Sequence, residues 1–179
     1  MIFDAKRKMI GNTMRNKIVV AVLLALAFIV VSCNPANRYE EEEKSLIADF
    51  IANNNITVAP DSHGLYYIEI TPGTGEKIRT GDSVGVYYSM MLLSGKLVQT
   101  NVEATTPFRS RVSTDLLIEG WVIGLNQMKL GTKASLLMPS KLAYGTTGIY
   151  DYYYGVTILP GYTPLLYEIE VVELTRAKK

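Results

Sequence analysis

Six aromatic and aliphatic side chains close to turns are the residues of this chain whose types and positions best suit a functional site. They are Tyr88, Phe108, Ile118, Trp121, Tyr144 and Tyr167. Brought together, such side chains would form an apolar cleft with a few hydroxyl and backbone donors, which is the composition of a typical ligand pocket. Considered singly, each is more often a plain core residue.

Polar catalysis has little support in the sequence. His63 is the only histidine, and it lies in the polar turn "PDSHG", residues 60–64, with no nucleophile elbow nearby. No His, Cys, Asp or Glu residues cluster at metal-binding spacing. The glycine-rich "PGTGEK", residues 72–77, lacks the second half of a phosphate loop and leads into a strand, so we expect a hairpin turn. The sequence therefore predicts neither a metal nor a cofactor.

An apolar segment near the N-terminus has the form of an export signal. Arg15 and Lys17 precede an uninterrupted apolar run, residues 18–31. A comfortable membrane span needs about 20 residues, so the run is short for one and better suits the core of a signal peptide. It ends in "VVSC", residues 30–33, which resembles the bacterial lipobox, where the leader is cut before the cysteine and the thiol carries lipid.

We therefore expect residues 1–32 to be a lipoprotein signal peptide and Cys33 to be the lipid-attachment site. The domain would then be exported and anchored by lipid to the cell envelope, in the outer membrane of a Gram-negative bacterium. The alternative is a short signal anchor that stays uncleaved, which would also tether an exported domain. The true start stays open among Met1, Met9 and Met14, because a start at Met14 gives a leader of usual length.

The charge balance argues against a nucleic-acid partner. Removal of residues 1–32 takes away five basic residues and one acidic residue, so the formal net charge changes from +1 to −3. Binding to nucleic acid then loses its electrostatic basis. Because Cys33 is the only cysteine, the exported domain cannot form an internal disulfide and depends on its core for stability.

The segment after the cysteine predicts a short tether and a helix. We assign residues 33–45 to the lipid site and tether, 46–63 to an N-terminal helix and linker, and 64–179 to the main domain. The acidic run Glu40–Glu43 lies near the expected helix start, where the helix dipole favours negative charge. One apolar stripe at helical spacing follows, formed by Leu46, Ile47, Phe50 and Ile51. The helix should stop at residues 53–55, and it either docks or dimerises, or packs on its own domain.

The main domain reads as strands and turns with one helix. Extended, alternating or β-branched runs predict strands within residues 64–71, 82–93, 133–140 and 164–174. Only "LLIEGWVIGLNQM", residues 116–128, has helical spacing, through Leu117, Trp121 and Leu125. One short helix against an antiparallel sheet is an α+β design.

The order of motifs is specific. The segments "GDSVGVYYSMMLLSGKLVQT", "PFRSRVSTDLLIEGWVIGLNQMKLGTKASLLMPSKLAYG" and "LPGYTPLLYEIEVVEL" follow one another from Gly81 to Leu174. In this order and spacing the chain resembles the FKBP-type peptidyl-prolyl cis-trans isomerases, and its N-terminal part looks like the extension of exported lipoprotein members. The resemblance implies a twisted antiparallel sheet of five or six strands wrapped around one short helix.

The resemblance also implies a site for isomerising Xaa-Pro bonds of exported or envelope polypeptides. Tyr88 would form its wall, Phe108 and Leu117 would line it, and Trp121 would be its floor. The Ile118 N–H and the Tyr144 hydroxyl would each bond a substrate carbonyl, and Tyr167 would stand at the back, where the family usually has phenylalanine. An apolar pocket favours the twisted amide over the planar one, so this chemistry needs no histidine.

Two further residues that the resemblance places in the pocket, Val98 and Gln99, depart from the family pattern, since they stand where Phe-Asp is usual. We expect slower isomerisation and weak binding of the macrolide ligands that use this pocket. Two other functions stay open: a non-catalytic chaperone or assembly lipoprotein that holds polypeptides in the same cleft, and a structural envelope lipoprotein without the site.

The segment "TTGIYDYYYGVTI", residues 146–158, is longer than its family counterpart by roughly six residues and should overhang the pocket. The residues expected to contact an extended peptide are Tyr150, Tyr152, Tyr153, Tyr154 and Ile158. Such a segment would be a lid or a platform for polypeptide substrates. The equally weighted alternative is that its tyrosines merely pack the loop against the domain.

Overall fold

The chain divides into two compact units, Met1–Tyr39 and Glu40–Lys179, and the computed structural model describes residues 35–178. The expected signal peptide over residues 1–32 and the expected lipid site at Cys33 lie outside the described residues. Of the first unit only residues 35–39 are described, and they are helical. Within residues 35–178, no helix has the length and apolar character needed to cross a membrane.

The N-terminal helix α2 comprises Pro35–Asn53, so it includes most of the segment expected to be a tether. Proline is favoured in the first turn of a helix, since the amide hydrogen it lacks would have no partner there. No glycine or second proline follows before the end of the helix, which comes at Asn53 as predicted. Because Glu40–Glu43 lie beyond the first turn, the helix dipole has little effect on them.

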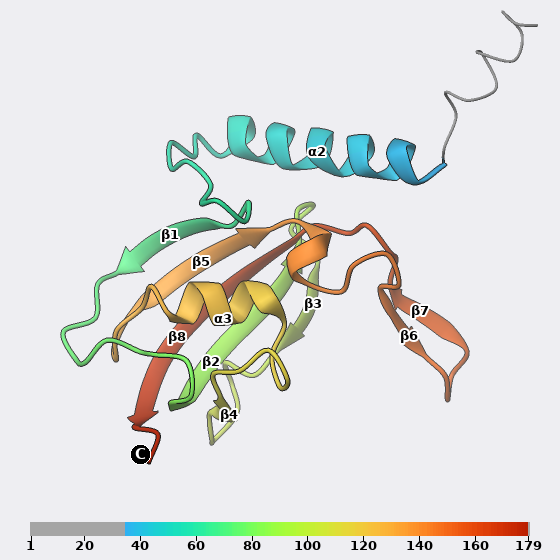
Figure 1. Ribbon diagram of the computed structural model, residues 1–179. Helices are drawn as coiled ribbons and strands as arrows, with labels where there is room; N and C mark the ends of the chain where they lie inside the picture. The colour runs from blue at the N-terminus through green and yellow to red at the C-terminus, as the bar shows by residue number, and fades with distance from the viewer. Residues whose placement is uncertain (1–34, 179) are drawn as a thin grey trace, which may run out of the picture. The chain divides into compact units, whose positions relative to one another are not determined.

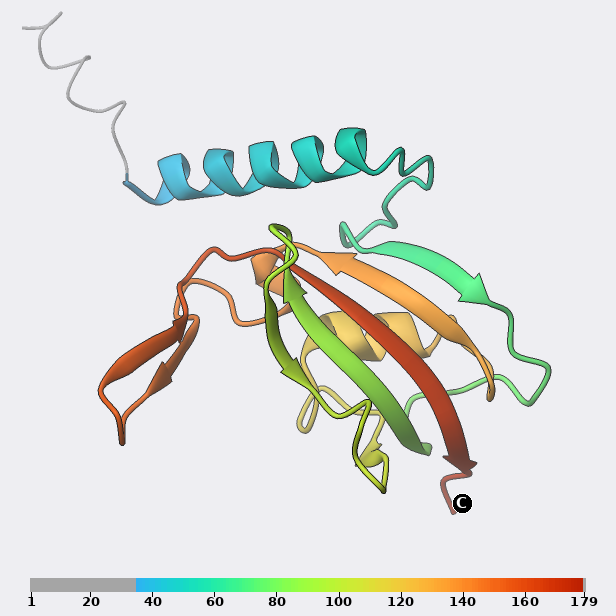
Figure 2. The same ribbon diagram turned by 180° about the vertical axis from the view of Figure 1, so that it is seen from behind.

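Six strands form one antiparallel sheet in the order β1-β5-β8-β2-β3, with β4 paired to β2. The strands are β1 (Tyr66–Thr71), β2 (Ser83–Leu92), β3 (Leu97–Thr100), β4 (Phe108–Arg111), β5 (Lys133–Met138) and β8 (Leu165–Thr175). The short helix α3 (Glu119–Leu125) lies against one face of this sheet, as the two opposite views show (Figures 1 and 2). The expected α+β fold of five or six strands around one short helix is confirmed.

The core lies between the sheet and α3. Alternate residues of β8 are buried, as the period of two in a strand requires, and they are Leu165, Tyr167, Ile169 and Val171. Trp121 and Leu125 of α3 belong to the same buried cluster. The helical spacing of these two residues in the sequence therefore marks the face that α3 turns toward the sheet.

Two glycines allow α3 to approach β5 closely. A Cβ atom at Gly120 would collide with the side chain of Met138, and one at Gly124 would collide with the side chain of Leu136. Glycine weakens an isolated helix by about 1 kcal/mol relative to alanine. Tertiary packing therefore decides the helical state of α3, and the absence of two side chains fixes its distance from β5.

The connection between the first two strands differs from the sequence prediction. The expected hairpin turn at residues 72–77 is wrong, because β1 pairs with β5 whereas β2 lies beyond β8. The segment instead lies beside the loop that connects α3 to β5. Gly73 N–H donates to Thr132 Oγ1 at 3.1 Å, and Gly75 N–H donates to the Leu130 carbonyl oxygen at 3.0 Å. Turn-forming residues locate a change of direction, but they do not tell which strands become neighbours.

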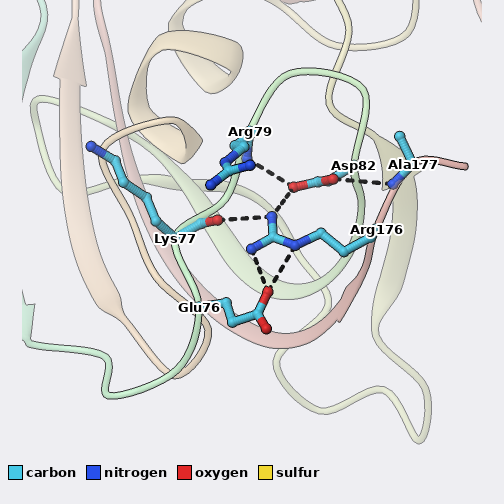
Figure 3. A network of polar contacts seen from close by, with 6 residues as sticks. All are labelled: Glu76, Lys77, Arg79, Asp82, Arg176 and Ala177. Carbon is cyan, nitrogen blue, oxygen red and sulfur yellow. Dashed lines mark hydrogen bonds and ion pairs between the residues drawn. The ribbon is translucent and has the colours of Figure 1, made fainter. Parts of the chain in front are cut away.

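Arg176, directly after β8, holds together segments that are far apart in the sequence (Figure 3). Its guanidinium donates to the Glu76 carboxylate, to the Lys77 carbonyl oxygen at 2.9 Å and to Asp82 Oδ2 at 2.5 Å. These contacts tie the end of the last strand to the connection that precedes β2. They fasten the C-terminal end of β8, which is a central strand of the sheet.

Asp82 is the buried member of this network, with 3% of its surface exposed. Burial alone would raise the pKa of Asp82, but hydrogen bonds from Ala177 N–H, Arg176 and Arg79 N–H outweigh that effect, so the pKa lies below its ordinary value. A lowered folded-state pKa means that ionised Asp82 stabilises the fold above the ordinary value of 3.8. That contribution is lost as the pH falls through the folded-state pKa.

We expect Asp82→Asn to lower the free energy of unfolding by about 2 kcal/mol at pH 7, because a charged hydrogen-bond acceptor becomes a neutral amide. Urea denaturation of both proteins measures the difference, which should shrink as the pH falls below about 4. The control is Glu76→Gln, which removes the exposed partner of Arg176 and should change stability much less. Equal losses in the two variants would contradict this account.

Candidate functional site

A cleft of about 250 Å³ opens between α3 and the strands. Its lining residues are Tyr88, Gln99, Phe108, Leu116, Leu117, Ile118, Trp121, Tyr144 and Tyr167. Eight of the nine residues that the sequence analysis placed in the pocket are therefore brought together, and Val98 is the exception. They come from β2, β3, β4, the start of α3, the loop after β5 and β8.

Trp121 forms the floor of the cleft, and aromatic rings stand around it. Its ring centroid lies 5.1 Å from that of Tyr88, 5.4 Å from that of Tyr167 and 6.1 Å from that of Phe108, with interplanar angles of 80°, 89° and 84°. Such edge-to-face arrangements are favourable, because the positive ring edge meets a negative ring face. The indole nitrogen is buried and has no hydrogen-bond partner among the described residues, so the floor offers no polar contact.

Two phenol hydroxyls lie side by side in the cleft. Tyr144 Oη is 3.3 Å from Tyr167 Oη, and Tyr167 Oη donates to Met90 Sδ at 2.8 Å. Either hydroxyl can donate within the pair. Burial and the hydrogen bond with Tyr144 raise the pKa of Tyr167, and burial raises the pKa of Tyr88. Both of these phenols are therefore neutral at physiological pH.

The start of α3 supplies a backbone donor. Ile118 is the residue that precedes the helix, and its carbonyl oxygen accepts a hydrogen bond from Trp121 N–H at 3.0 Å. Its own N–H donates to no acceptor among the described residues.

Leu116, whose surface is 58% exposed, also lines the cleft. Sequence reasoning missed Leu116, because only its neighbour Leu117 fits the helical spacing of the core residues.

The two positions that depart from the family pattern have different surroundings. Met90 pairs with Gln99 and Met91 pairs with Leu97, so Val98 is the extra residue of a β-bulge in β3. The Val98 side chain is partly buried against the core and does not line the cleft, whereas Gln99 does. Position 98 thus contributes no side chain to the lining of the cleft, whereas Gln99 contributes a neutral amide.

The tyrosine-rich segment forms a separate β-hairpin, made of β6 (Ile149–Asp151) and β7 (Val156–Leu159). Both views show it projecting beside the main sheet (Figures 1 and 2). Asp151 Oδ1 accepts hydrogen bonds from Tyr153 N–H at 2.9 Å and from Tyr154 N–H at 3.0 Å. The segment expected to be a loop is thus an ordered hairpin, in which this short polar side chain organises a tight turn between two strands.

The hairpin tyrosines are exposed rather than packed on the domain. Tyr152 is 89% exposed, Tyr153 88% and Tyr154 73%. The ring of Tyr152 lies 5.0 Å from that of Tyr150, and the rings of Tyr153 and Tyr154 lie 4.9 Å apart, measured between centroids. The alternative that these side chains merely fix the loop to its own domain is therefore wrong. The hairpin, including Ile158, adds no residue to the lining of the cleft.

The arrangement limits the chemistry available in the cleft. None of the nine residues that line it carries a charge at neutral pH. The cleft can exclude water from a small apolar group, offer ring faces to it, and donate hydrogen bonds from the Ile118 N–H and the Tyr144 hydroxyl. Such a site can stabilise one amide geometry over another without moving a proton.

Comparisons with known proteins match this region of the chain. A family model described as FKBP-type peptidyl-prolyl cis-trans isomerase matches residues 74–172, which include every residue that lines the cleft. "FK506-binding protein 4" of Dictyostelium discoideum is 34% identical over 109 residues, or 61% of this chain and 28% of that protein. A "Probable FKBP-type peptidyl-prolyl cis-trans isomerase" of Haemophilus influenzae is 30% identical over 139 residues, or 78% of this chain and 54% of that protein. The match thus spans about half or less of these two relatives.

A solved structure agrees in fold. A peptidyl-prolyl cis-trans isomerase from Pseudomonas syringae aligns with a TM-score of 0.66 and 30% identity, and the alignment covers 81% of this chain and 99% of that chain. The expected resemblance is confirmed by sequence and by structure. Because the family model covers more than half of its residues, the chain belongs to the FKBP-type peptidyl-prolyl cis-trans isomerases, a family of enzymes.

Proposed function

We propose that the protein isomerises Xaa-Pro peptide bonds of polypeptides in the cleft above Trp121. The observation that carries this proposal is the aromatic floor and wall beside two separate hydrogen-bond donors, the Ile118 N–H and the Tyr144 hydroxyl. A proline ring is small and apolar, and it suits a cleft of about 250 Å³. The peptide carbonyls next to proline can accept the two donated hydrogen bonds.

The physical basis is the difference between the planar amide and the twisted amide. Rotation about the Xaa-Pro bond has a barrier of about 20 kcal/mol, because resonance holds the amide planar. Resonance also separates charge, so water stabilises the planar form more than the twisted form. A water-excluding cleft removes that advantage, and donors placed for the twisted carbonyl add to the effect. The Tyr144 hydroxyl must then donate its hydrogen bond to the substrate carbonyl oxygen instead of to Tyr167 Oη.

The proposed rate is below that of a typical member. Val98 leaves one side of the cleft without an aromatic face, and Gln99 offers a neutral amide where a carboxylate is usual. Pockets for drug-sized ligands usually enclose about 300–1,000 Å³, so the smaller cleft also supports weak binding of macrolides. The proposed clients are proline-containing exported or envelope polypeptides. This location rests on the signal-peptide pattern of residues 1–32 and on Cys33 as the lipid anchor.

A second candidate function is a binding module with little catalysis. The exposed tyrosines of the β6–β7 hairpin favour it, because they offer apolar area and hydroxyls outside the cleft. An extended polypeptide could contact this hairpin while a proline enters the cleft. The two functions differ in turnover, which a direct assay measures.

Removal of the floor or of the hydroxyl donor tests the proposed isomerase. We expect Trp121→Ala to lower kcat/KM for an Xaa-Pro peptide by about 100-fold and Tyr144→Phe to lower it by about fivefold, because the first removes the contact surface and the second one hydrogen bond. A protease-free isomerisation assay measures both. Tyr87→Phe removes a hydroxyl outside the cleft and is the matched control. Wild-type activity in the Trp121→Ala protein would refute the proposed site.

Restoration of an aromatic side chain at position 98 tests the proposed loss of rate. We expect Val98→Phe to raise kcat/KM by roughly fivefold to tenfold, since an aromatic contact in the transition state contributes about 1 kcal/mol or slightly more. The same assay on Xaa-Pro peptides measures the change, and Val98→Leu is the control for side-chain volume alone. Ordinary family rates in the wild type, with no gain from Val98→Phe, would contradict the proposal that Val98 lowers the rate.

Shortening of the hairpin tests its role in polypeptide binding. We expect replacement of residues 150–156 by a two-residue turn to weaken binding of an unfolded polypeptide about tenfold, while binding of a short Xaa-Pro peptide changes less than twofold. Dissociation constants for both ligands give the answer. Exchange of Tyr152, Tyr153 and Tyr154 for serine leaves the hairpin length intact and is the second variant. Equal weakening for both ligands would remove the hairpin from the proposed function.

A further inference from the structure

A buried carboxylate of the N-terminal helix reaches the segment that follows β5. Glu43 of α2 is only 8% exposed, unlike the other glutamates of its acidic run. Its carboxylate accepts two hydrogen bonds from Ser140, one from the backbone N–H and one from the hydroxyl at 2.9 Å. Both oxygens of the carboxylate are therefore used by a single residue of another element.

Ser140 in turn holds the backbone on both sides of Tyr144. Ser140 begins the short 3-10 helix η1 (Ser140–Leu142), which has no side-chain cap of its own. Its carbonyl oxygen accepts hydrogen bonds from Ala143 N–H at 2.8 Å and from Gly145 N–H at 2.8 Å. The amide hydrogens of Ala143 and Gly145, the residues on either side of Tyr144, thus converge on one oxygen of the residue that Glu43 holds.

A cavity lies beside this link. It encloses about 410 Å³ and is lined by Glu43, Lys44 and Ile47 of α2 and by Ser140, Gly145 and Tyr162, among others. Because the space between the helix and the loop is partly empty here, close packing contributes little to the contact between α2 and the loop. The charge-assisted hydrogen bonds of Glu43 therefore join α2 to the loop. Within its own domain the loop is also held by hydrogen bonds from Gly148 N–H to the Tyr144 carbonyl oxygen and from Tyr162 N–H to the Gly145 carbonyl oxygen.

We propose that Glu43 is a positioning residue for Tyr144. Its carboxylate fixes Ser140, and Ser140 binds the amide hydrogens of the residues on either side of Tyr144, so the helix α2 sets where the Tyr144 hydroxyl lies in the cleft. The inference rests on the proposed isomerase function, in which that hydroxyl contacts the substrate. It gives α2 a role in the site although no residue of α2 lines the cleft.

A double-mutant cycle tests this inference on the full chain in detergent. We expect Glu43→Ala to lower kcat/KM for an Xaa-Pro peptide by about fivefold, because a displaced donor loses its transition-state contact. Glu43→Gln, which keeps one acceptor oxygen, should lose less. In the Tyr144→Phe background, Glu43→Ala should lower kcat/KM less than twofold, since its effect passes through the missing hydroxyl. Glu41→Gln makes the same chemical change as Glu43→Gln at an exposed position of α2, and it should leave kcat/KM unchanged.

A role confined to stability gives a different pattern. Glu43→Ala would then lower the unfolding midpoint, while kcat/KM of the folded protein would stay within twofold or fall equally in both backgrounds, and either result overturns the inference. NMR of tyrosine rings labelled with carbon-13 gives a second readout that needs no turnover. Glu43→Ala should shift the Tyr144 signals, which are assigned by their loss in Tyr144→Phe. A wild type without turnover would refute the isomerase proposal but not the positioning role of Glu43. In that case the NMR experiment decides, and Tyr144 signals that do not shift in Glu43→Ala would overturn the positioning role.

Discussion

The contact between α3 and β5 is the constraint on which the cleft depends. Gly120 and Gly124 have no side chains to hold α3 away from Leu136 and Met138, so the helix lies close to the sheet. This approach places Trp121 under the rings of Tyr88 and Tyr167 instead of at the surface. A larger residue at either glycine would push the floor of the cleft away from its walls.

The cleft and the polar contacts around it have separate roles. In the proposed isomerase the cleft would act without charge, since an uncharged site that excludes water weakens the preference for a planar amide. The polar groups act at its margins: Glu43 and Ser140 hold the loop that carries Tyr144. Farther away, Arg176 and Asp82 tie the end of β8 to the connection that precedes β2. No charged side chain lines the cleft, and charged side chains instead hold the elements that enclose it.

Sequence reasoning predicted the parts of the molecule that are governed by periodicity and motif order. The long strands β2 and β8, the short helix and eight residues of the cleft follow from such patterns. It failed where long-range pairing decides, as at residues 72–77, where turn residues suit either a hairpin or a crossing connection. It also could not foresee the bulge at Val98 or the bonding of Glu43. One glutamate among four carries no local signal of the residue that it will meet.

The central claim is that the cleft above Trp121 takes a proline ring. Trp121 is the only tryptophan of the chain, so its fluorescence reports on this cleft alone. Titration with an Xaa-Pro peptide should give a saturable change in emission, whereas the same peptide with alanine in place of proline should give none. An unchanged emission at millimolar concentrations of the prolyl peptide, or an equal response to both peptides, would contradict the account.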